Sequence, residues 1–298
     1  MKYKRIAFIL VLTMLTSIFK AFSKQPPETG APRTTDLSGN RLTFAMVEDF
    51  SRDMPARDLV TDFNLSQLNL KANDEAGLLI QRWWDIKEPG WFGRELGTVM
   101  LDISVREVVA NTSQRLQQEN FNTRDKLQFV FMYDEYLTQK YRSMNLAAGA
   151  EEHEDNAHYY SAFTLLGEKL LVKHKDYMAN GQNWVESAAS GPSGTVHQLF
   201  AIPLTDDHFL EVTLIFAINR GYPTGHYFLE RADRITEPFL DTLFIDYARE
   251  NPYQSLVGER WHTPSVKALM QEQYDTIVKQ FPAQEAPEAL DPADEQSE

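Results

Sequence analysis

The segment HQLFAIPLTDDHFLEVTLIFAI, residues 197–218, decides the fold that we expect for this chain. Two apolar runs, residues 197–202 and 209–218, flank the turn-forming residues PLTDDH, which is the pattern of a β-hairpin. The second run is apolar on both faces of a strand around Leu214, Ile215 and Phe216. Strands of this kind are covered on both faces, so we expect this one at the centre of a sheet.

Alternating apolar residues predict further strands on either side of this hairpin. In residues 98–105, TVMLDISV, every second side chain is apolar, which places four of them on one face. Residues 159–165 and 169–174 flank Leu166-Gly167-Glu168 and predict a second hairpin. Two more strands are predicted at residues 41–47 and 78–86.

Three segments have the pattern of helices. Residues 123–141 carry one apolar stripe at helical spacing, formed by Phe129, Met132, Tyr133, Tyr136 and Leu137. Residues 228–246 carry a second stripe, in which Pro238 marks either a kink or a fresh start. Residues 264–281 form the third segment, in which Thr263 is the N-cap and Pro264 takes the first helical position.

These elements predict an α+β fold, in which helices pack on a mostly antiparallel sheet within one domain, residues 41–281. The preceding residues 24–40 are rich in proline, glycine and threonine, which is typical of a flexible linker. Residues 282–298 contain six acids, three prolines and no base, which predicts a disordered acidic tail.

Residues 1–23 have the pattern of a signal peptide. Lys2, Lys4 and Arg5 precede an apolar run that is shorter than a membrane span, and Ala21-Phe22-Ser23 fits a cleavage site. We therefore expect a mature chain that starts near Lys24 in the periplasm and has no membrane span. In the alternative interpretation the signal is not cleaved and anchors the chain in the inner membrane.

The net charge and the cysteine content restrict the partners and the chemistry that we expect for this chain. The net charge is −14, and removal of the four basic residues that precede Lys24 makes it −18. Such a surface repels nucleic acid and favours cationic partners, although high net charge also serves plain solubility. The chain has no cysteine, which excludes disulfides, thiolate nucleophiles and cysteine metal sites.

Two family resemblances follow from the segment 197–218, from the helix that ends FLDTLFI and from GNRLTFAMVEDFSRDMP near the start. These segments resemble exported α+β domains of the PsbP-like type. They also resemble periplasmic immunity proteins of bacterial type VI secretion systems. Both resemblances imply a non-catalytic fold, and neither assigns a site residue.

Motifs that carry chemistry are incomplete in this sequence. His153, Glu154 and His158 nearly form the His-Glu-x-x-His zinc motif, but Ala157 stands where the second histidine belongs. At i+5 the second imidazole leaves the helix face of the first, so we predict a solvated loop, no metal site and no cofactor. The stretch SGPSG, residues 190–194, lacks the Gly-x-Ser-x-Gly spacing of a serine nucleophile and is typical of a turn.

Aromatic residues provide the candidate binding site. Trp83 and Trp84 are adjacent in a predicted strand, so one enters the core and the other faces outward. The turn EPGW presents Trp91 beside Phe92. We therefore take Trp84, Trp91 and Phe92 as partner-binding residues, and the alternative is that these aromatic residues serve packing.

The sequence favours an exported, non-catalytic binding or inhibitory protein of the bacterial envelope. Its most concrete version is an immunity protein that neutralises a secreted toxin with a cationic surface. The alternative is a periplasmic hydrolase, in which the fold brings an acid together with His153, His158 or His197 as base.

Overall fold

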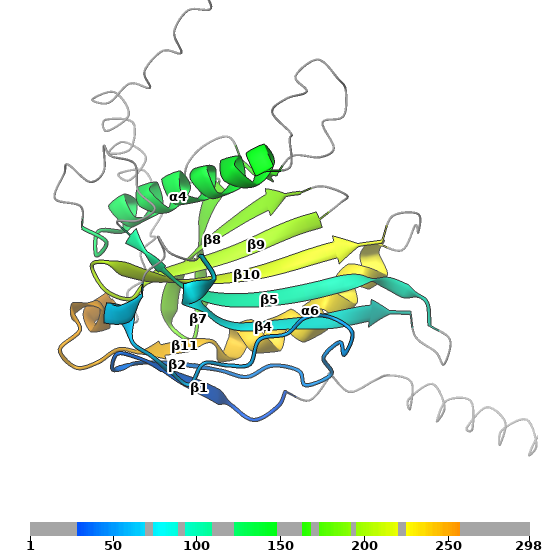
Figure 1. The fold of residues 1–298 in the computed structure, drawn as a ribbon, viewed down its shortest axis with the longest axis horizontal. Helices are drawn as coiled ribbons and strands as arrows, with labels where there is room; N and C mark the ends of the chain where they lie inside the picture. The colour runs from blue at the N-terminus through cyan, green and yellow to red at the C-terminus, as the bar shows by residue number, and fades with distance from the viewer. Residues whose placement is uncertain are drawn as a thin grey trace, which may run out of the picture. The chain divides into compact units, whose positions relative to one another are not determined.

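The computed structural model describes residues 29–68, 74–88, 93–108, 122–147, 163–167, 173–191, 195–219 and 225–256. Within these ranges the chain forms a larger and a smaller β-sheet, helix α4 (Lys126–Ala147) and helix α6 (Gly225–Thr242) (Figure 1). Short 3₁₀ turns occur at Leu65–Gln67, Asp74–Gly77 and Pro252–Leu256. The predicted α+β class, with mostly antiparallel strands in one domain, is confirmed.

The larger sheet has the strand order β4-β5-β10-β9-β8-β6, and β7 also pairs with β8. All of these pairs are antiparallel. The strands are β4 (Leu78–Lys87), β5 (Glu95–Glu107), β6 (Thr164–Leu165), β7 (His174–Ala179), β8 (Gln182–Ser190), β9 (Thr195–Pro203) and β10 (His208–Ile218). The predicted hairpin of residues 197–218 is confirmed as β9–β10, and β10 lies between β5 and β9 as expected for a strand covered on both faces.

The smaller sheet has the order β11-β2-β1-β3. Its strands are β1 (Arg33–Leu37), β2 (Asn40–Phe44), β3 (Asp62–Phe63) and β11 (Phe244–Asp246). A two-residue turn, Ser38-Gly39, joins β1 to β2, and both turn residues have positive φ, which suits a tight hairpin. β3 pairs with β1 in parallel.

Three predictions need correction. The expected linker, residues 24–40, contains β1, whose Leu37 is fully buried because it packs into the core. The helix predicted over residues 228–246 runs on through Pro238 but ends at Thr242, because the next residues pair with β2 as β11. The two arms of the second predicted hairpin do not pair with each other in the described ranges, since β6 and β7 both pair with β8.

Other predicted elements fall outside the described residues. These are the signal segment 1–23, the helix at 264–281 and the tail at 282–298. No helix within the described ranges combines the length and the low polarity that a membrane crossing requires.

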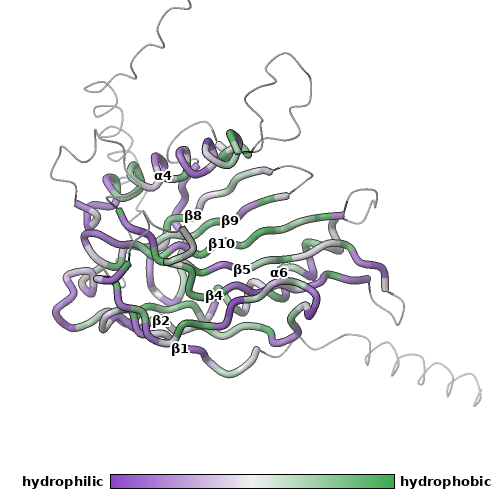
Figure 2. The backbone as a smooth tube through the Cα atoms, in the orientation of Figure 1, coloured by the Kyte–Doolittle hydropathy of each residue, from purple (hydrophilic) through white to green (hydrophobic). Residues whose placement is uncertain are grey.

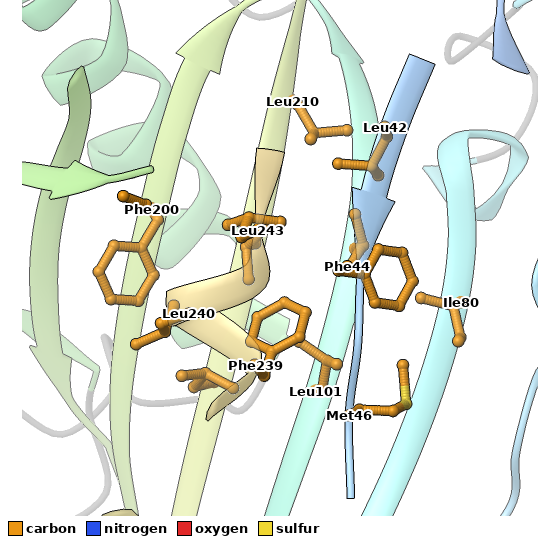
Figure 3. Close-up of a cluster of buried hydrophobic side chains, with 14 of the residues drawn as sticks. Leu42, Phe44, Met46, Ile80, Leu101, Phe200, Leu210, Phe239, Leu240 and Leu243 are labelled. Carbon is orange, nitrogen blue, oxygen red and sulfur yellow. The ribbon is translucent and has the colours of Figure 1, made fainter. Parts of the chain in front are cut away.

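The apolar face of the larger sheet forms the core with α6 and the smaller sheet. Alternate residues of β5 and β10 point to this face, as predicted for residues 98–105, and their side chains are almost fully buried. They pack with side chains of β2 and α6 (Figure 3). Burial of each large apolar side chain contributes about 1.5–3 kcal/mol, so this layer is the main source of stability. The labelled side chains in Figure 3 are Leu42, Phe44, Met46, Ile80, Leu101, Phe200, Leu210, Phe239, Leu240 and Leu243.

The opposite face of the larger sheet is covered by α4 (Figure 1). Most residues of β10 are apolar, whereas apolar and polar residues alternate along α4 (Figure 2). The helix therefore turns one stripe to the sheet and the other to solvent.

The segment 51–60 lies along the outer edge of β4. Backbone hydrogen bonds run from Ser51 N to Trp83 O at 2.8 Å and from Val60 N to Leu79 O at 2.9 Å. Arg57 and Gln81 form an isolated bridge between these two contacts. The backbone groups on this edge of β4 are thus partly paired.

Gly97 in β5 provides a test of this packing. Its φ is +149°, and a Cβ atom there would lie 2.1 Å from the carbonyl oxygen of Ala217. We expect Gly97→Ala to destabilise the protein by about 2–4 kcal/mol, because the backbone of β10 must move. The measurement is the free energy of unfolding from denaturant titration.

The matched control is Gly181→Ala in the β7–β8 turn. Gly181 also has a positive φ, +77°, but a Cβ atom there meets nothing within 4 Å. This substitution meets no neighbouring atom, so it costs only the strain of an L residue at positive φ, about 1 kcal/mol. Equal losses at the two positions would contradict the predicted clash.

Candidate functional site

Polar side chains gather on the face of the larger sheet that α4 covers. The register of β5 and β10 places Asp102 opposite Thr213 and Ser104 opposite Glu211 on this face. Ser104, Glu211 and Thr213 are buried. A sheet that is apolar on one face and polar on the other requires polar partners from the covering helix, because buried polar groups must be hydrogen-bonded.

Helix α4 begins directly after a capping residue. The backbone N–H of Gln128 donates to the side-chain Oδ1 atom of Asp125 at 3.1 Å. The backbone N–H of Phe129 donates to the carbonyl oxygen of Asp125 at 2.9 Å. The predicted stripe from Phe129 to Leu137 is buried, although the helix begins three residues later than predicted and continues to Ala147. The rings of Tyr133 and Tyr136 meet Phe209 of β10 edge-on, with centroids 5.8 and 5.3 Å away.

Glu211 lies at the centre of the interface between α4 and the sheet. Its side chain is 1% exposed. The hydroxyls of Tyr133 and Tyr136 donate to its two carboxylate oxygens, each at 3.2 Å, and Lys140 Nζ donates to Oε1 at 2.7 Å. Arg106 of β5 approaches Oε1 to 3.7 Å. The carboxylate is thus neutralised and hydrogen-bonded by groups from α4 and from the neighbouring strand.

The charges around Glu211 decide its ionisation. Burial alone would raise the pKa of its carboxyl, but Lys140 and Arg106, with hydrogen bonds from Lys140 and Tyr136, outweigh burial and hold the pKa below its usual value. On the same face, burial raises the pKa of Asp102, although the carboxylate accepts a hydrogen bond from the side chain of Gln81. Glu211 therefore stays ionised in the interior.

A second set of contacts joins an acid, an imidazole and a hydroxyl. His174 Nε2 lies 2.8 Å from Asp134 Oδ1 of α4, and its Nδ1 lies 2.7 Å from Ser187 Oγ of β8. Lys173 Nζ also lies 3.4 Å from Asp134 Oδ1. Burial would raise the pKa of Asp134, but His174 and Lys173 lower it below its usual value. Both His174 and Ser187 are buried, at 3% and 2% exposure.

His197 of β9 forms a third contact with α4. Its Nδ1 atom lies 3.0 Å from the hydroxyl of Tyr141, and its ring packs against that of Phe163 with centroids 5.0 Å apart. Burial, followed by the charge of Lys140, lowers the pKa of His197 to about 4. The imidazole is therefore neutral at physiological pH and serves as a packed hydrogen-bonding group.

The first turn of α4 is joined to β7 by an ion pair. Lys126 donates to Asp176, and both side chains are largely buried. Burial lowers the pKa of Lys126 to about 7. Polar contacts therefore join α4 to the sheet along the helix, from Lys126 through Asp134 and Lys140 to Tyr141.

These contacts make the polar interface a structural assembly. Its carboxylates and imidazoles are engaged with side chains of this chain beneath α4, where Glu211, His174 and Ser187 are almost fully covered. A metal centre would need three or more His, Asp or Glu side chains in one place, and the described part of the chain contains no such group.

The structure corrects the predicted role of Trp84. Its side chain is 2% exposed, and its Nε1–H donates to the carbonyl of Val47 at 3.0 Å. The alternation of β4 turns Ile80, Trp84 and Ile86 to the core, so Trp83 is the residue of the pair on the other face, where it is partly exposed. Trp91 and Phe92, the other two proposed partner-binding residues, lie outside the described residues.

Of the three histidines named as candidate bases, the structure describes only His197. His153 and His158 lie outside the described residues, and His197 is paired with Tyr141. Ser190 is the last residue of β8, and Ser193 lies outside the described residues.

The sequence analysis missed the groups that meet beneath α4. One signal was present for Glu211, since it is the single charged residue in the apolar run FLEVTLIF, where a buried strand predicts a buried charge. Asp134, His174 and Ser187 are distant in sequence, and no local spacing indicates that they meet.

The sequence matches no protein-family model and no curated protein significantly.

The substitution Lys140→Met tests the ion pair between Lys140 and Glu211. In Lys140→Met the buried carboxylate of Glu211 loses its closest cation, and we expect a loss of stability of about 2–4 kcal/mol at neutral pH. The loss should shrink as the pH falls toward 4, because protonated Glu211 no longer needs a cation. Denaturant titrations of both proteins across this pH range provide the measurement.

Two controls accompany this variant. Lys175→Met removes an exposed lysine from β7 and should leave stability within about 0.5 kcal/mol. The double variant Lys140→Met, Glu211→Gln should recover part of the loss, since the amide carries no charge. A pH-independent loss, equal in the single and double variants, would show that Lys140 acts through packing alone.

Proposed function

We propose that this chain is an exported binding protein of the bacterial envelope, which acts on a protein partner with a cationic surface. Its most concrete form is a periplasmic immunity protein that inhibits a secreted toxin. The observation that carries the proposal is the net charge of −14, which becomes −18 if cleavage before Lys24 removes four basic residues. An acidic protein attracts a basic partner over several ångströms and accelerates its docking.

The arrangement beneath α4 supports a binding role. Glu211, His174 and His197 are used to hold the helix on the sheet, so these groups stabilise a rigid framework. A rigid framework suits inhibition by surface complementarity, because little conformational entropy is lost on docking.

Association with the partner should depend on salt. The mature chain, from Lys24, is used as bait against envelope and secreted-effector fractions at about 50 mM and about 300 mM salt. We expect one stoichiometric basic partner whose recovery falls as salt rises. Recovery that does not change with salt would contradict a charge-driven interaction.

The second candidate function is that of a hydrolase, and one specific contact favours it. Asp134, His174 and Ser187 are linked at 2.8 and 2.7 Å, an acid–imidazole–hydroxyl order like that of a serine hydrolase, but with the two ring nitrogens exchanged. In such a site the imidazole accepts the proton of the hydroxyl as its oxygen attacks an acyl carbon. The 2% exposure of Ser187 opposes this role, because a substrate must reach Oγ.

A fluorophosphonate probe, which labels nucleophilic serines, separates the two candidates. We expect the folded chain to remain unlabelled, since the hydroxyl of Ser187 is covered. The variant Ser187→Ala is the matched control. Labelling of the native chain that disappears in this variant would favour the hydrolase over the binding protein.

A further inference from the structure

The outward face of α6 carries a line of carboxylates. Glu230, Asp233, Glu237 and Asp241 are spaced by three or four residues, so they follow one another along one side of the helix. All four are exposed, whereas the opposite side of the helix, which includes Phe228 and Phe239, is buried in the core.

Two large apolar side chains are exposed at the start of the same helix. Tyr227 is 49% exposed and Leu229 is 50% exposed. Among the described residues the other large apolar side chains with such exposure are spread over different elements, namely α4, β7, β9 and the turn after β6. Residues i and i+2 project to different sides of a helix, so Tyr227 and Leu229 flank the line of carboxylates, one at each border.

The acidic surface continues from α6 onto the larger sheet. Burial raises the pKa of the Tyr177 hydroxyl, and the carboxylates of Asp241, Glu186 and Glu237 raise it further, which places carboxylates of α6 and β8 around one residue of β7. The ring of Tyr177 is fixed against that of Phe200, with centroids 4.8 Å apart. Gln198 donates to Glu186 at 2.8 Å and holds that carboxylate in place.

Basic residues only partly offset these charges. Arg234 lies on the same outward side of α6 and pairs with Glu230 at 2.6 Å. This exposed pair contributes little to stability, so its members are free to exchange partners on docking. Arg231 is half-buried on the same helix. The helix therefore has four acids against two arginines.

We propose that the outward face of α6, formed by Tyr227, Leu229, Glu230, Asp233, Glu237 and Asp241, is the docking surface for a protein that presents lysine and arginine side chains. This inference rests on the proposed binding function and names the surface that performs it. Charge complementarity identifies the occupant, since a second copy of this face, a nucleic acid and an anionic membrane surface would each be repelled. Tyr227 and Leu229 supply the apolar anchor that charged surfaces lack.

Site-specific photocrosslinking tests the surface in the full chain produced in its own cells. A benzophenone amino acid replaces Leu229, and in a matched control it replaces Leu146 of α4, which is 52% exposed. We expect a discrete adduct with a basic protein, identified by mass spectrometry, from position 229 and at least about tenfold less from position 146.

Charge reversal then tests the carboxylates. The triple variant Glu230→Lys, Asp233→Lys, Glu237→Lys should lower the yield of the adduct at position 229 about tenfold. The triple variant Asp49→Lys, Asp53→Lys, Asp62→Lys changes the net charge equally at exposed positions elsewhere and should keep most of the yield. Thermal melting of both variants checks that each remains folded.

The possible outcomes separate this inference from the proposed function. A partner that is recovered by the bait chain but gives no adduct at position 229 would overturn the docking surface and leave the binding function in place. Equal losses in the two triple variants would also overturn it, because net charge alone would then explain the attraction. Absence of any partner from both experiments would contradict the binding function itself.

Discussion

The ion pair between Glu211 and Lys140 is the contact on which the arrangement of this protein depends. Glu211 lies in the central strand of the larger sheet, where a carboxylate without a cation would be strongly unfavourable. Lys140 satisfies it only when α4 lies across this face and brings Tyr133 and Tyr136 to the same carboxylate. An apolar residue at this position would allow the helix to slide, whereas a charge defines one position along the strand. The buried carboxylate therefore specifies where the helix lies, and the apolar contacts around it supply most of the stability.

The periodicity of apolar residues was sufficient to predict a strand or helix where each of its faces keeps the same surroundings along its length. The β9–β10 hairpin, the apolar alternation of β5 and the stripe of α4 were predictable because burial selects every second residue in a strand and every third or fourth in a helix. The β7–β8 hairpin had a strong local signal that the sequence analysis did not use. Asn180-Gly181 forms its two-residue turn, and both residues adopt the positive φ that this dipeptide favours.

Features that depend on long-range pairing were not predictable from local patterns. Phe244 continues the apolar stripe of α6, yet residues Phe244–Asp246 form β11 because β2 offers unpaired backbone groups. Alternation required Trp83 and Trp84 to face opposite ways, but only the packing of the smaller sheet decides that Trp84 is the one in the core. The groups that meet beneath α4 come from α4, β5, β7, β8, β9 and β10, so their assembly follows from the strand order. A single sequence does not show that order.

The segment that borders β4 has a consequence for the behaviour of the chain in concentrated solution. Open edges of β-sheets are where chains of the same kind join into aggregates and fibrils. Residues 51–60 occupy backbone groups on the outer edge of β4 and thereby cover part of that edge. Loss of this cover, by proteolysis or by mutation within it, would expose the outer edge of β4 and favour edge-to-edge association between chains.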